Sequence, residues 1–572
     1  MEINQVLEFE VAFPGEQPLG VEEYLKGVSK ELILNVAVSF LAFNINGSEY
    51  TNEKLLTTIF CKENEDFANK VLKEIYTQEY AQRIRIDNPY SSLRLFEEFF
   101  AKEETEDTLT IPEVERNLFK AYLVLNSEFT ARQKVAFESI EELDEDLKTP
   151  MRYFCTQYPI SDKMNYNIAE IWSCQVMKST YLFEFLEENK DTAPLLKAFL
   201  EHFKCQTWQE YLKELLAITT PLIKNENFTD INVVKDETFS ATCEFLEKHC
   251  VRTDDLELED FIALRSNPFY KIKDGTYRVI FKLFAIEKIF KGIYFVLREV
   301  NELLPTEDKI VNLKSLIGLE FSEKRSLYKA IDLIYPNKCI KHSGEKIDTF
   351  MDGGIDYYVR KGKNILLFES KDFLIPAEKK LSYDFNIYEE EFERTLYFTT
   401  KKDKRKPKAV LQLINNIRRV LKKEFTGDTQ YNYRDVFIYP ILIIHDHQYD
   451  VPGFNQLLNT WFQEELETLR EEGLFVNRVK QLIVVNIDSL FYNQIGLSKG
   501  MQLHEVINFY TKRIVGNTTM DNKLNFRSEY DPFSHHMIDI ITINGFGEVP
   551  PIVETVAPSL FKDEYVEESK EA

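Results

Sequence analysis

Residues 353–371 read GGIDYYVRKGKNILLFESK, and this stretch decides how the C-terminal part of the chain folds. It divides into two short apolar runs, 355–359 and 365–371, on either side of a tight turn. Gly362 in the turn is free to adopt the positive φ that tight hairpin turns need. The pattern therefore predicts two paired β-strands, and the rest of the chain is interpreted outward from them.

Three polar side chains of this hairpin form a candidate metal site. Glu369 and Lys371 project to the same side of their strand because side chains alternate between faces. Asp356 lies on the neighbouring strand. The two carboxylates, with the backbone carbonyl of Ser370, are oxygen ligands of the kind that Mg²⁺ (or Mn²⁺) takes, and Lys371 would position a water. The residues thus predict metal-dependent phosphodiester hydrolysis.

A helix is predicted over 310–335, where it ends before Pro336. Its apolar stripe, continued backwards from Leu327 by four and seven residues, reaches Glu323 and Glu320. A carboxylate on the core-facing side of a helix needs a reason. Either one glutamate reaches the metal site, or both mark where the helix emerges into solvent, and the sequence leaves both interpretations open.

Positive charge is concentrated after the hairpin, although the chain carries a net charge of −25. Residues 401–424 contain ten Lys and Arg but only two acidic residues. The local field, rather than the net charge, steers a polyanion to a site. A helix is predicted over 408–425, with Gln412 on its polar flank. The candidate nucleic-acid contacts are Lys404, Arg405, Lys408, Arg418, Arg419 and Lys422.

Residues 310–490 resemble the PD-(D/E)XK nuclease superfamily, the restriction-endonuclease-like fold. Asp356 matches the aspartate of the motif, in a G-I-D rather than a P-D setting, and Glu369 and Lys371 match the (D/E)XK pair. Gln412 resembles the glutamine on the following helix of several branches, although the long gap after Lys371 implies an insertion. The resemblance also implies that a glutamate of the first helix joins the metal site.

The fold implied by this resemblance is a central mixed sheet flanked by helices, in the order α-β-β-β-α-β. The first strand of that order falls at 339–342 or at 346–350. The implied activity is a Mg²⁺-dependent DNA endonuclease, in the setting of bacterial restriction or anti-phage defence, with defence-system proteins or a second copy as further partners. RNA stays an alternative substrate because phosphate contacts do not distinguish it from DNA.

A second hypothesis is a nuclease fold used as a scaffold or sensor that binds nucleic acid or proteins without cleaving them. In that case the tips of Asp356, Glu369 and Lys371 would not converge. ATP-driven translocation is not expected because the chain has no G-x-x-x-x-G-K-[ST] loop.

The predicted fold class is α/β, with a large, mainly α-helical N-terminal region. The expected division is a helical domain over 1–255, a helix-hairpin-helix connector over 256–305, the nuclease-like domain over 306–515 and an irregular acidic tail over 516–572. The connector is interpreted either as a structural clip or as a winged-helix-like element. The N-terminus has no signal-peptide pattern and no apolar run reaches membrane-spanning length, so a cytoplasmic protein is predicted.

Overall fold

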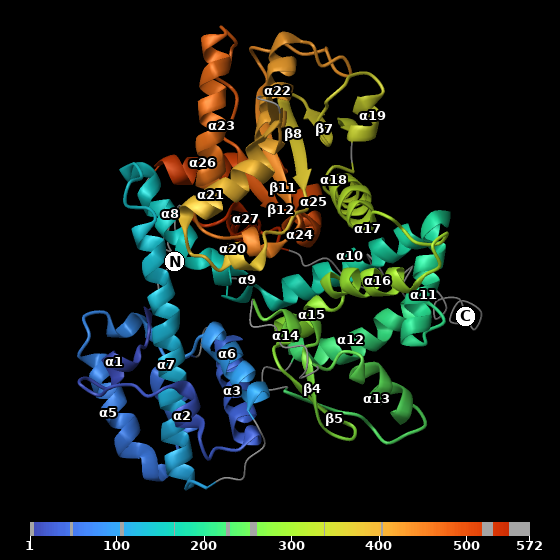
Figure 1. Cartoon of the computed structure of the whole chain (residues 1–572). Helices are drawn as coiled ribbons and strands as arrows, with labels where there is room; N and C mark the ends of the chain where they lie inside the picture. The colour runs from blue at the N-terminus through green and yellow to red at the C-terminus, as the bar shows by residue number, and fades with distance from the viewer. Residues whose placement is uncertain are drawn as a thin grey trace. The chain divides into compact units, whose positions relative to one another are not determined.

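A five-stranded mixed sheet is the centre of the C-terminal part of the computed structural model (Figure 1), with strand order β12-β11-β8-β7-β6. Its strands are β6 (Ile340–Ser343), β7 (Tyr357–Lys361), β8 (Asn364–Lys371), β11 (Phe437–Ile444) and β12 (Ile483–Asn486). The predicted hairpin is β7 and β8, which pair antiparallel. The strand before them begins at Ile340, in the first of the two predicted places, and α19 (Gly344–Asp348) occupies the second.

The sheet changes from antiparallel to parallel pairing at β8. β6 pairs antiparallel with β7, whereas β11 runs parallel to both β8 and β12. Pro440 favours either an edge position or a bulge for this strand, and β11 is an interior strand. Pairing of β11 with β12 begins at Ile441, one residue after the proline. Pro440, which has no N–H to donate, is therefore not one of the residues paired with β12.

Helices cover both faces of the sheet. α22 (Ala409–Lys422) and α23 (Phe454–Glu471) pack in one large apolar cluster with Ile365 and Leu367 of β8. Tyr439 of β11 points to the opposite face, where its hydroxyl accepts a hydrogen bond from Asn508 of α26 (Leu503–Gly516). Alternation along β8 therefore places Glu369 and Lys371 on the same face as α22.

The structure describes residues 5–45, 50–102, 108–164, 166–224, 229–251, 260–336, 338–401, 404–516 and 530–547. Two compact units share these residues. The C-terminal unit combines 136–212 with the residues from 293 onward, and the N-terminal unit combines 2–135 with 213–292. This division differs from the predicted helical domain over 1–255, because the middle of that region packs with the sheet.

Aromatic packing explains why residues 136–212 belong with the sheet. Phe154 and Tyr158, on and just after α8 (Glu145–Gln157), stack against each other and contact Phe392. Phe392 ends α21 (Phe385–Phe392), which lies in the insertion between Lys371 and α22. The insertion is therefore part of the apolar core rather than a surface loop.

The N-terminal unit contains the helix and hairpin predicted after residue 256. The helix is α14 (Ile262–Ser266), and the hairpin is β4 (Phe269–Lys273) and β5 (Thr276–Val279). A further strand, β3 (Asp230–Asn232), pairs with β5. Three basic side chains are engaged within the unit: Arg265 with Asp260, Lys271 with Glu247 and Arg278 with Asp230. Both interpretations of this connector stay predictions.

The helices of the N-terminal unit include α3 (Lys30–Ile45), α5 (Glu65–Tyr76), α6 (Pro89–Ala101) and α13 (Phe239–Glu247). α16 (Lys291–Leu303) follows the hairpin region. In the described ranges no helix is long and apolar enough to cross a membrane.

The segment predicted as an irregular tail contains a helix, α27 (Phe533–Ile543). Its residues Met537 and Ile540 are buried, and it packs against α26 and β12. The sequence indicates one ordered piece in this tail, 537–543, and that piece lies within α27, whose apolar residues complete the core of the C-terminal unit. The last part of the predicted acidic tail, residues 548–572, lies outside the described residues.

Candidate active site around Lys371

The hairpin brings its polar residues together where β8 ends. Tyr357 pairs with Phe368 in the antiparallel register, so Asp356 lies beside Glu369, one step further along. The Asp356 side chain accepts a hydrogen bond on Oδ2 from the main-chain N–H of Ser370, at 2.7 Å. The bond ties the first strand to the residue between Glu369 and Lys371.

The Lys371 ammonium is at the centre of this group. Its Nζ lies 2.9 Å from Glu369 Oε1, 3.6 Å from Glu323 Oε2 and 3.8 Å from Asp356 Oδ2. It also donates a hydrogen bond to the carbonyl of Ser370, at 2.8 Å. Burial lowers the pKa of Lys371, but Glu369, Asp356 and Glu323 together raise it above its ordinary value. Lys371 is therefore an ammonium at neutral pH.

Glu369 is a buried carboxylate without full compensation. Its side chain is completely buried, and Oε2 has no hydrogen-bond partner among the described residues. Burial, with the negative charge of Asp356 added, raises the pKa of Glu369 to about 8, while Lys371 opposes that rise. A buried carboxylate left in this condition costs stability unless a cation or a proton satisfies it.

The sequence did not decide between Glu320 and Glu323 as the glutamate that reaches the candidate metal site. In the structure, Glu323 lies beside Lys371. Glu323 Oε1 accepts a hydrogen bond from the main-chain N–H of Asp372 at 3.0 Å, and burial raises the pKa of Glu323 to about 7. Glu320 instead pairs with Lys324 at 2.9 Å, with its side chain 42% exposed.

The helix geometry explains the difference. Residues Leu316–Ser326 form a π-helix, which continues into the α-helix α18 (Leu327–Ile334). A π-helix bonds i to i+5, so its turns are wider than the α-helical turns that the predicted stripe assumed. Glu320 and Glu323, three residues apart, therefore point in different directions.

Gln412 is half-buried on the first turn of α22. Its N–H donates to the carbonyl of Lys408 at 2.8 Å, and its carbonyl accepts from the Asn416 side chain at 2.9 Å. In the described residues no hydrogen bond joins the Gln412 side chain to Asp356, Glu369 or Lys371, and its predicted contact with the site stays a prediction.

The donor set suits a hard divalent cation, although Lys371 stands among the donors. Carboxylate oxygens of Asp356 and Glu369 and the carbonyl of Ser370 all lie within 4 Å of the ammonium. No group of three Asp, Glu, His or Cys side chains in the described part of the chain is arranged to hold a metal ion. Mg²⁺ needs only one or two protein carboxylates because it retains several waters. The unpartnered Oε2 of Glu369 is the oxygen that most favours a cation here.

The predicted nucleic-acid contacts differ in how far they are engaged within the chain. Arg418 pairs with Glu472 at 2.8 Å. Arg419 donates to the carbonyls of Gly353 and Asp352, at 2.6 and 2.8 Å. These two arginines are thus used internally.

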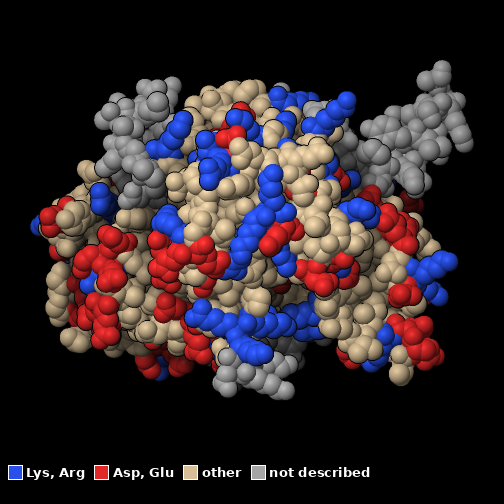
Figure 2. Space-filling model, turned by 90° about the horizontal axis from the view of Figure 1, so that it is seen from above, with Lys and Arg blue, Asp and Glu red and all other residues tan. Residues whose placement is uncertain are grey.

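The remaining predicted contacts are more accessible. Lys404 and Arg405 are exposed on β10 (Lys404–Pro407), which forms a hairpin with β9 (Phe398–Lys401), and Lys422 is exposed at the end of α22. Arg405 also lies over the ring of Phe398 at 4.2 Å. Lys408 is half-buried, and burial together with the charges of Lys406 and Lys371 lowers its pKa. Figure 2 shows patches of Lys and Arg side chains on one face, interspersed with acidic ones.

His445 is a neighbour of the site that the sequence did not indicate. It follows β11, and its Nε2 lies 2.8 Å from the hydroxyl of Ser370. Burial, helped by the charges of Lys178 and Lys371, lowers the pKa of His445 to about 3, so its imidazole is neutral. The parallel register places Ile444 beside Lys371, and only that pairing could have pointed to His445.

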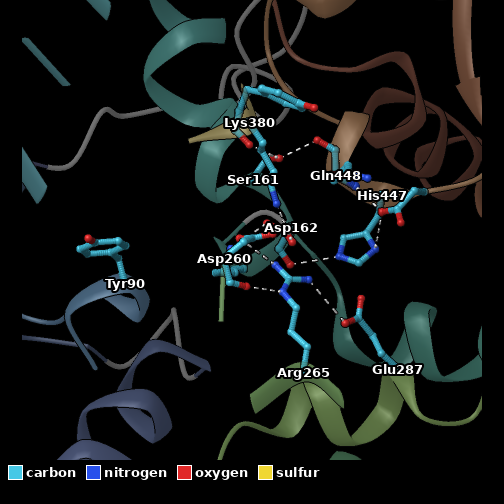
Figure 3. Close-up of polar contacts among 12 residues, drawn as sticks. Tyr90, Ser161, Asp162, Asp260, Arg265, Glu287, Lys380, His447 and Gln448 are labelled. Atoms are coloured by element: carbon cyan, nitrogen blue, oxygen red, sulfur yellow. Dashed lines mark hydrogen bonds and ion pairs between the residues drawn. The ribbon is translucent and has the colours of Figure 1, made fainter. Parts of the chain in front are cut away.

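A second buried polar group is centred on Asp162 and includes His447, two residues after His445 (Figure 3). Asp162 Oδ2 accepts from Lys380 at 3.1 Å, and its carbonyl lies 3.0 Å from His447 Nε2. The hydroxyl of Ser161 donates to the carbonyl of Gln448 at 2.6 Å. His445 and His447, in the turn after β11, are thus both engaged by other groups of the chain.

Comparisons with protein-family models, with curated proteins and with solved structures found no match to this chain.

Proposed function

We propose that the chain is a metal-dependent nuclease of the PD-(D/E)XK type, which hydrolyses phosphodiester bonds of DNA. The order of elements supports this proposal. A helix ending at Ile334 is followed by β6, β7 and β8, and α22 and β11 follow after the insertion. Apart from the short α19 between β6 and β7 and the elements of the insertion, this is the order α-β-β-β-α-β. The restriction-endonuclease-like fold is part of the proposal.

The observation that carries the proposal is that carboxylate oxygens of Asp356, Glu369 and Glu323 each lie within 4 Å of the Lys371 ammonium. A scaffold or sensor needs no such convergence. Burying the charged side chains of the Lys371 group together costs free energy, and Oε2 of Glu369 in particular has no hydrogen-bond partner in the described structure. Unfavourable groups of this kind are typical of sites that bind and react.

Asp356, Glu369 and the carbonyl of Ser370 would hold Mg²⁺ or Mn²⁺. When bound, the ion supplies Lewis-acid polarisation of a phosphoryl oxygen and eases deprotonation of the attacking water. The chain's own contribution is a fixed set of oxygens, held by the hydrogen bond from Ser370 N–H to Asp356.

Lys371 and Glu323 have separate roles in hydrolysis. Lys371 carries a permanent positive charge, which stabilises the negative charge that develops on the phosphate. Glu323, whose pKa is raised to about 7, accepts the proton of the attacking water as a general base. The water oxygen forms the new bond to phosphorus, the bond to the leaving oxygen breaks, and that oxygen takes a proton from solvent.

The hairpin of β9 and β10 supplies the nucleic-acid contact. Lys404, Arg405 and Lys406 are exposed on it, directly before Lys408 and α22. Side chains of this kind bind phosphates regardless of base sequence. A role in restriction or phage defence, with partners of that kind, stays a prediction from the resemblance.

The test is to incubate the full chain with plasmid, linear DNA, single-stranded DNA and RNA, with Mg²⁺ or with EDTA. We expect Mg²⁺-dependent cleavage of DNA that the Glu369→Ala variant lacks. A matched Glu320→Ala variant, which removes a nearby carboxylate outside the group, should cleave like the wild type. Equal cleavage by the wild type and Glu369→Ala would refute the proposal.

A further inference from the structure

The loop that leads to Asp356 is held by one arginine. This loop, residues 349–356, connects α19 to β7. Arg419 of α22 donates from Nη1 to the carbonyl of Gly353 at 2.6 Å and from Nη2 to the carbonyl of Asp352 at 2.8 Å. Nη1 also lies 3.3 Å from Asn416 Oδ1, which keeps the guanidinium oriented on its own helix.

Other contacts hold the two ends of the loop. Near its beginning, the carbonyl of Phe350 accepts from the Thr426 hydroxyl at 3.3 Å. At its end, the carbonyl of Asp356 accepts from the N–H of Gly344 at 2.7 Å. Between these points, no other side chain in the described ranges donates a hydrogen bond to the main chain of Asp352 or Gly353.

The glycines of this loop leave it dependent on Arg419. Gly353 has a positive φ of 65°, which a residue with a Cβ adopts only with strain. A Cβ on Gly354 would stand 2.2 Å from Cγ2 of Ile347, so the chain passes closely over α19 there. Two consecutive glycines have little intrinsic preference for one path. The Arg419 guanidinium binds two consecutive carbonyls of this loop and thereby favours one path of the main chain.

We propose that Arg419 is a positioning residue for Asp356 and not a contact to nucleic acid. This inference rests on the proposed function, because it assumes that the placement of Asp356 matters for hydrolysis. The planar guanidinium binds both carbonyls at fixed separation, and charge-assisted hydrogen bonds are about twice as strong as neutral ones. Asp356 lies three residues beyond Gly353, and its carboxylate must remain against Ser370 N–H.

The first test measures the loop itself, in the full chain without metal or nucleic acid. Amide hydrogen exchange of peptides covering 350–357 is compared between the wild type, Arg419→Ala, Arg419→Lys and the control Lys422→Ala, which changes an exposed residue of the same helix. We expect exchange about tenfold faster in both Arg419 variants and unchanged in the control. Wild-type exchange in Arg419→Ala would overturn the proposal.

The second test separates positioning from phosphate binding. DNA affinity is measured in EDTA at several salt concentrations, and cleavage is measured in Mg²⁺. We expect Arg419→Ala to keep the wild-type salt dependence and KM but to lose kcat by roughly 10- to 100-fold, without rescue in Arg419→Lys. A salt slope smaller by about 0.9, restored in Arg419→Lys, would identify a phosphate contact and overturn the proposal.

The two tests also separate this proposal from the proposed function. If the chain binds and cleaves no nucleic acid, the nuclease proposal fails, and hydrogen exchange still decides whether Arg419 holds the loop. If cleavage is normal in Arg419→Ala, only the positioning role fails.

Discussion

Two buried ionic groups of the C-terminal unit differ in whether the chain satisfies them. In the group around Asp162 (Figure 3), the carboxylate meets Lys380 at 3.1 Å and Lys163 at 3.4 Å, and all three side chains are almost completely buried. In the group around Lys371, three carboxylates share one ammonium, and Glu369 retains an oxygen without a hydrogen bond in the described structure.

The difference separates a structural ion pair from a candidate active site. A buried pair whose charges meet each other contributes to a defined fold, and breaking it leaves an uncompensated charge. A group with more carboxylates than cations is unfavourable by itself, and raised pKa values of Glu369 and Glu323 report that cost. Such a group is expected to gain most from an added cation.

The largest expected effect is on catalysis. Lys371→Ala should reduce the rate of DNA cleavage by about three orders of magnitude, since it removes the charge that stabilises the reacting phosphate. Single-turnover cleavage in Mg²⁺ measures this rate, and circular dichroism checks the fold. A folded Lys371→Ala protein with wild-type rate would show that the ammonium has no chemical role.

The next effect is on stability and concerns the other group. Lys380→Met should lower the free energy of unfolding by about 3 kcal/mol, because Asp162 then remains buried beside one fewer ammonium. Urea denaturation measures the change. If the variant that remains folded cleaves DNA at the wild-type rate, the two groups are functionally distinct. A large loss of cleavage with unchanged stability would show that the Asp162 group, assigned here a structural role, takes part in catalysis.

A smaller, pH-dependent effect is expected at Glu369. Its pKa is about 8 when folded and near 4.5 when unfolded, so the folded state retains a proton that the unfolded state has released. The free energy of unfolding of the metal-free protein should therefore fall as the pH rises between these two values.

Glu369→Gln removes this titration. In EDTA we expect the variant to be more stable than the wild type by on the order of 1 to 3 kcal/mol at about pH 8.5, and by less at about pH 5.5. Urea denaturation at both pH values measures the difference. A stability difference that does not change with pH would mean that Glu369 is not held in the protonated form.

The smallest expected effect is on nucleic-acid affinity. Lys404→Ala combined with Lys406→Ala should weaken DNA binding in EDTA and reduce its salt slope by about 2, because under the proposed function each lysine would contact a phosphate. Fluorescence anisotropy at several salt concentrations measures the slope. Lys423→Ala, which changes the exposed residue just after α22, is the control. Equal slopes in the double variant and the wild type would remove the β9–β10 hairpin from the binding surface.

Local patterns were sufficient to predict much of the sheet and the central residues of the site. Alternation around Gly362 placed Glu369 and Lys371 on one face, and the structure joins them to Asp356 as that pattern requires. The helix predicted over 408–425 likewise corresponds to α22.

Other features depend on long-range packing that a local pattern does not carry. The choice of Glu323 over Glu320 follows from π-helical turns, which the assumed α-helical period misses. The internal use of Arg419 depends on a loop 66 residues earlier in the chain. Residues 136–212 have an ordinary helical pattern, and only their aromatic contacts with the insertion show that they complete the C-terminal unit.

The most direct measurement of the central claim is calorimetric titration of the metal-free full chain with Mn²⁺, because it requires no knowledge of the natural substrate. We expect one binding site in the wild type and in Glu320→Gln, and loss of that site in Glu369→Gln and Asp356→Asn. Wild-type protein that binds no Mn²⁺, or binds it as well as Glu369→Gln does, would contradict the assignment of the Lys371 group as a metal-dependent active site.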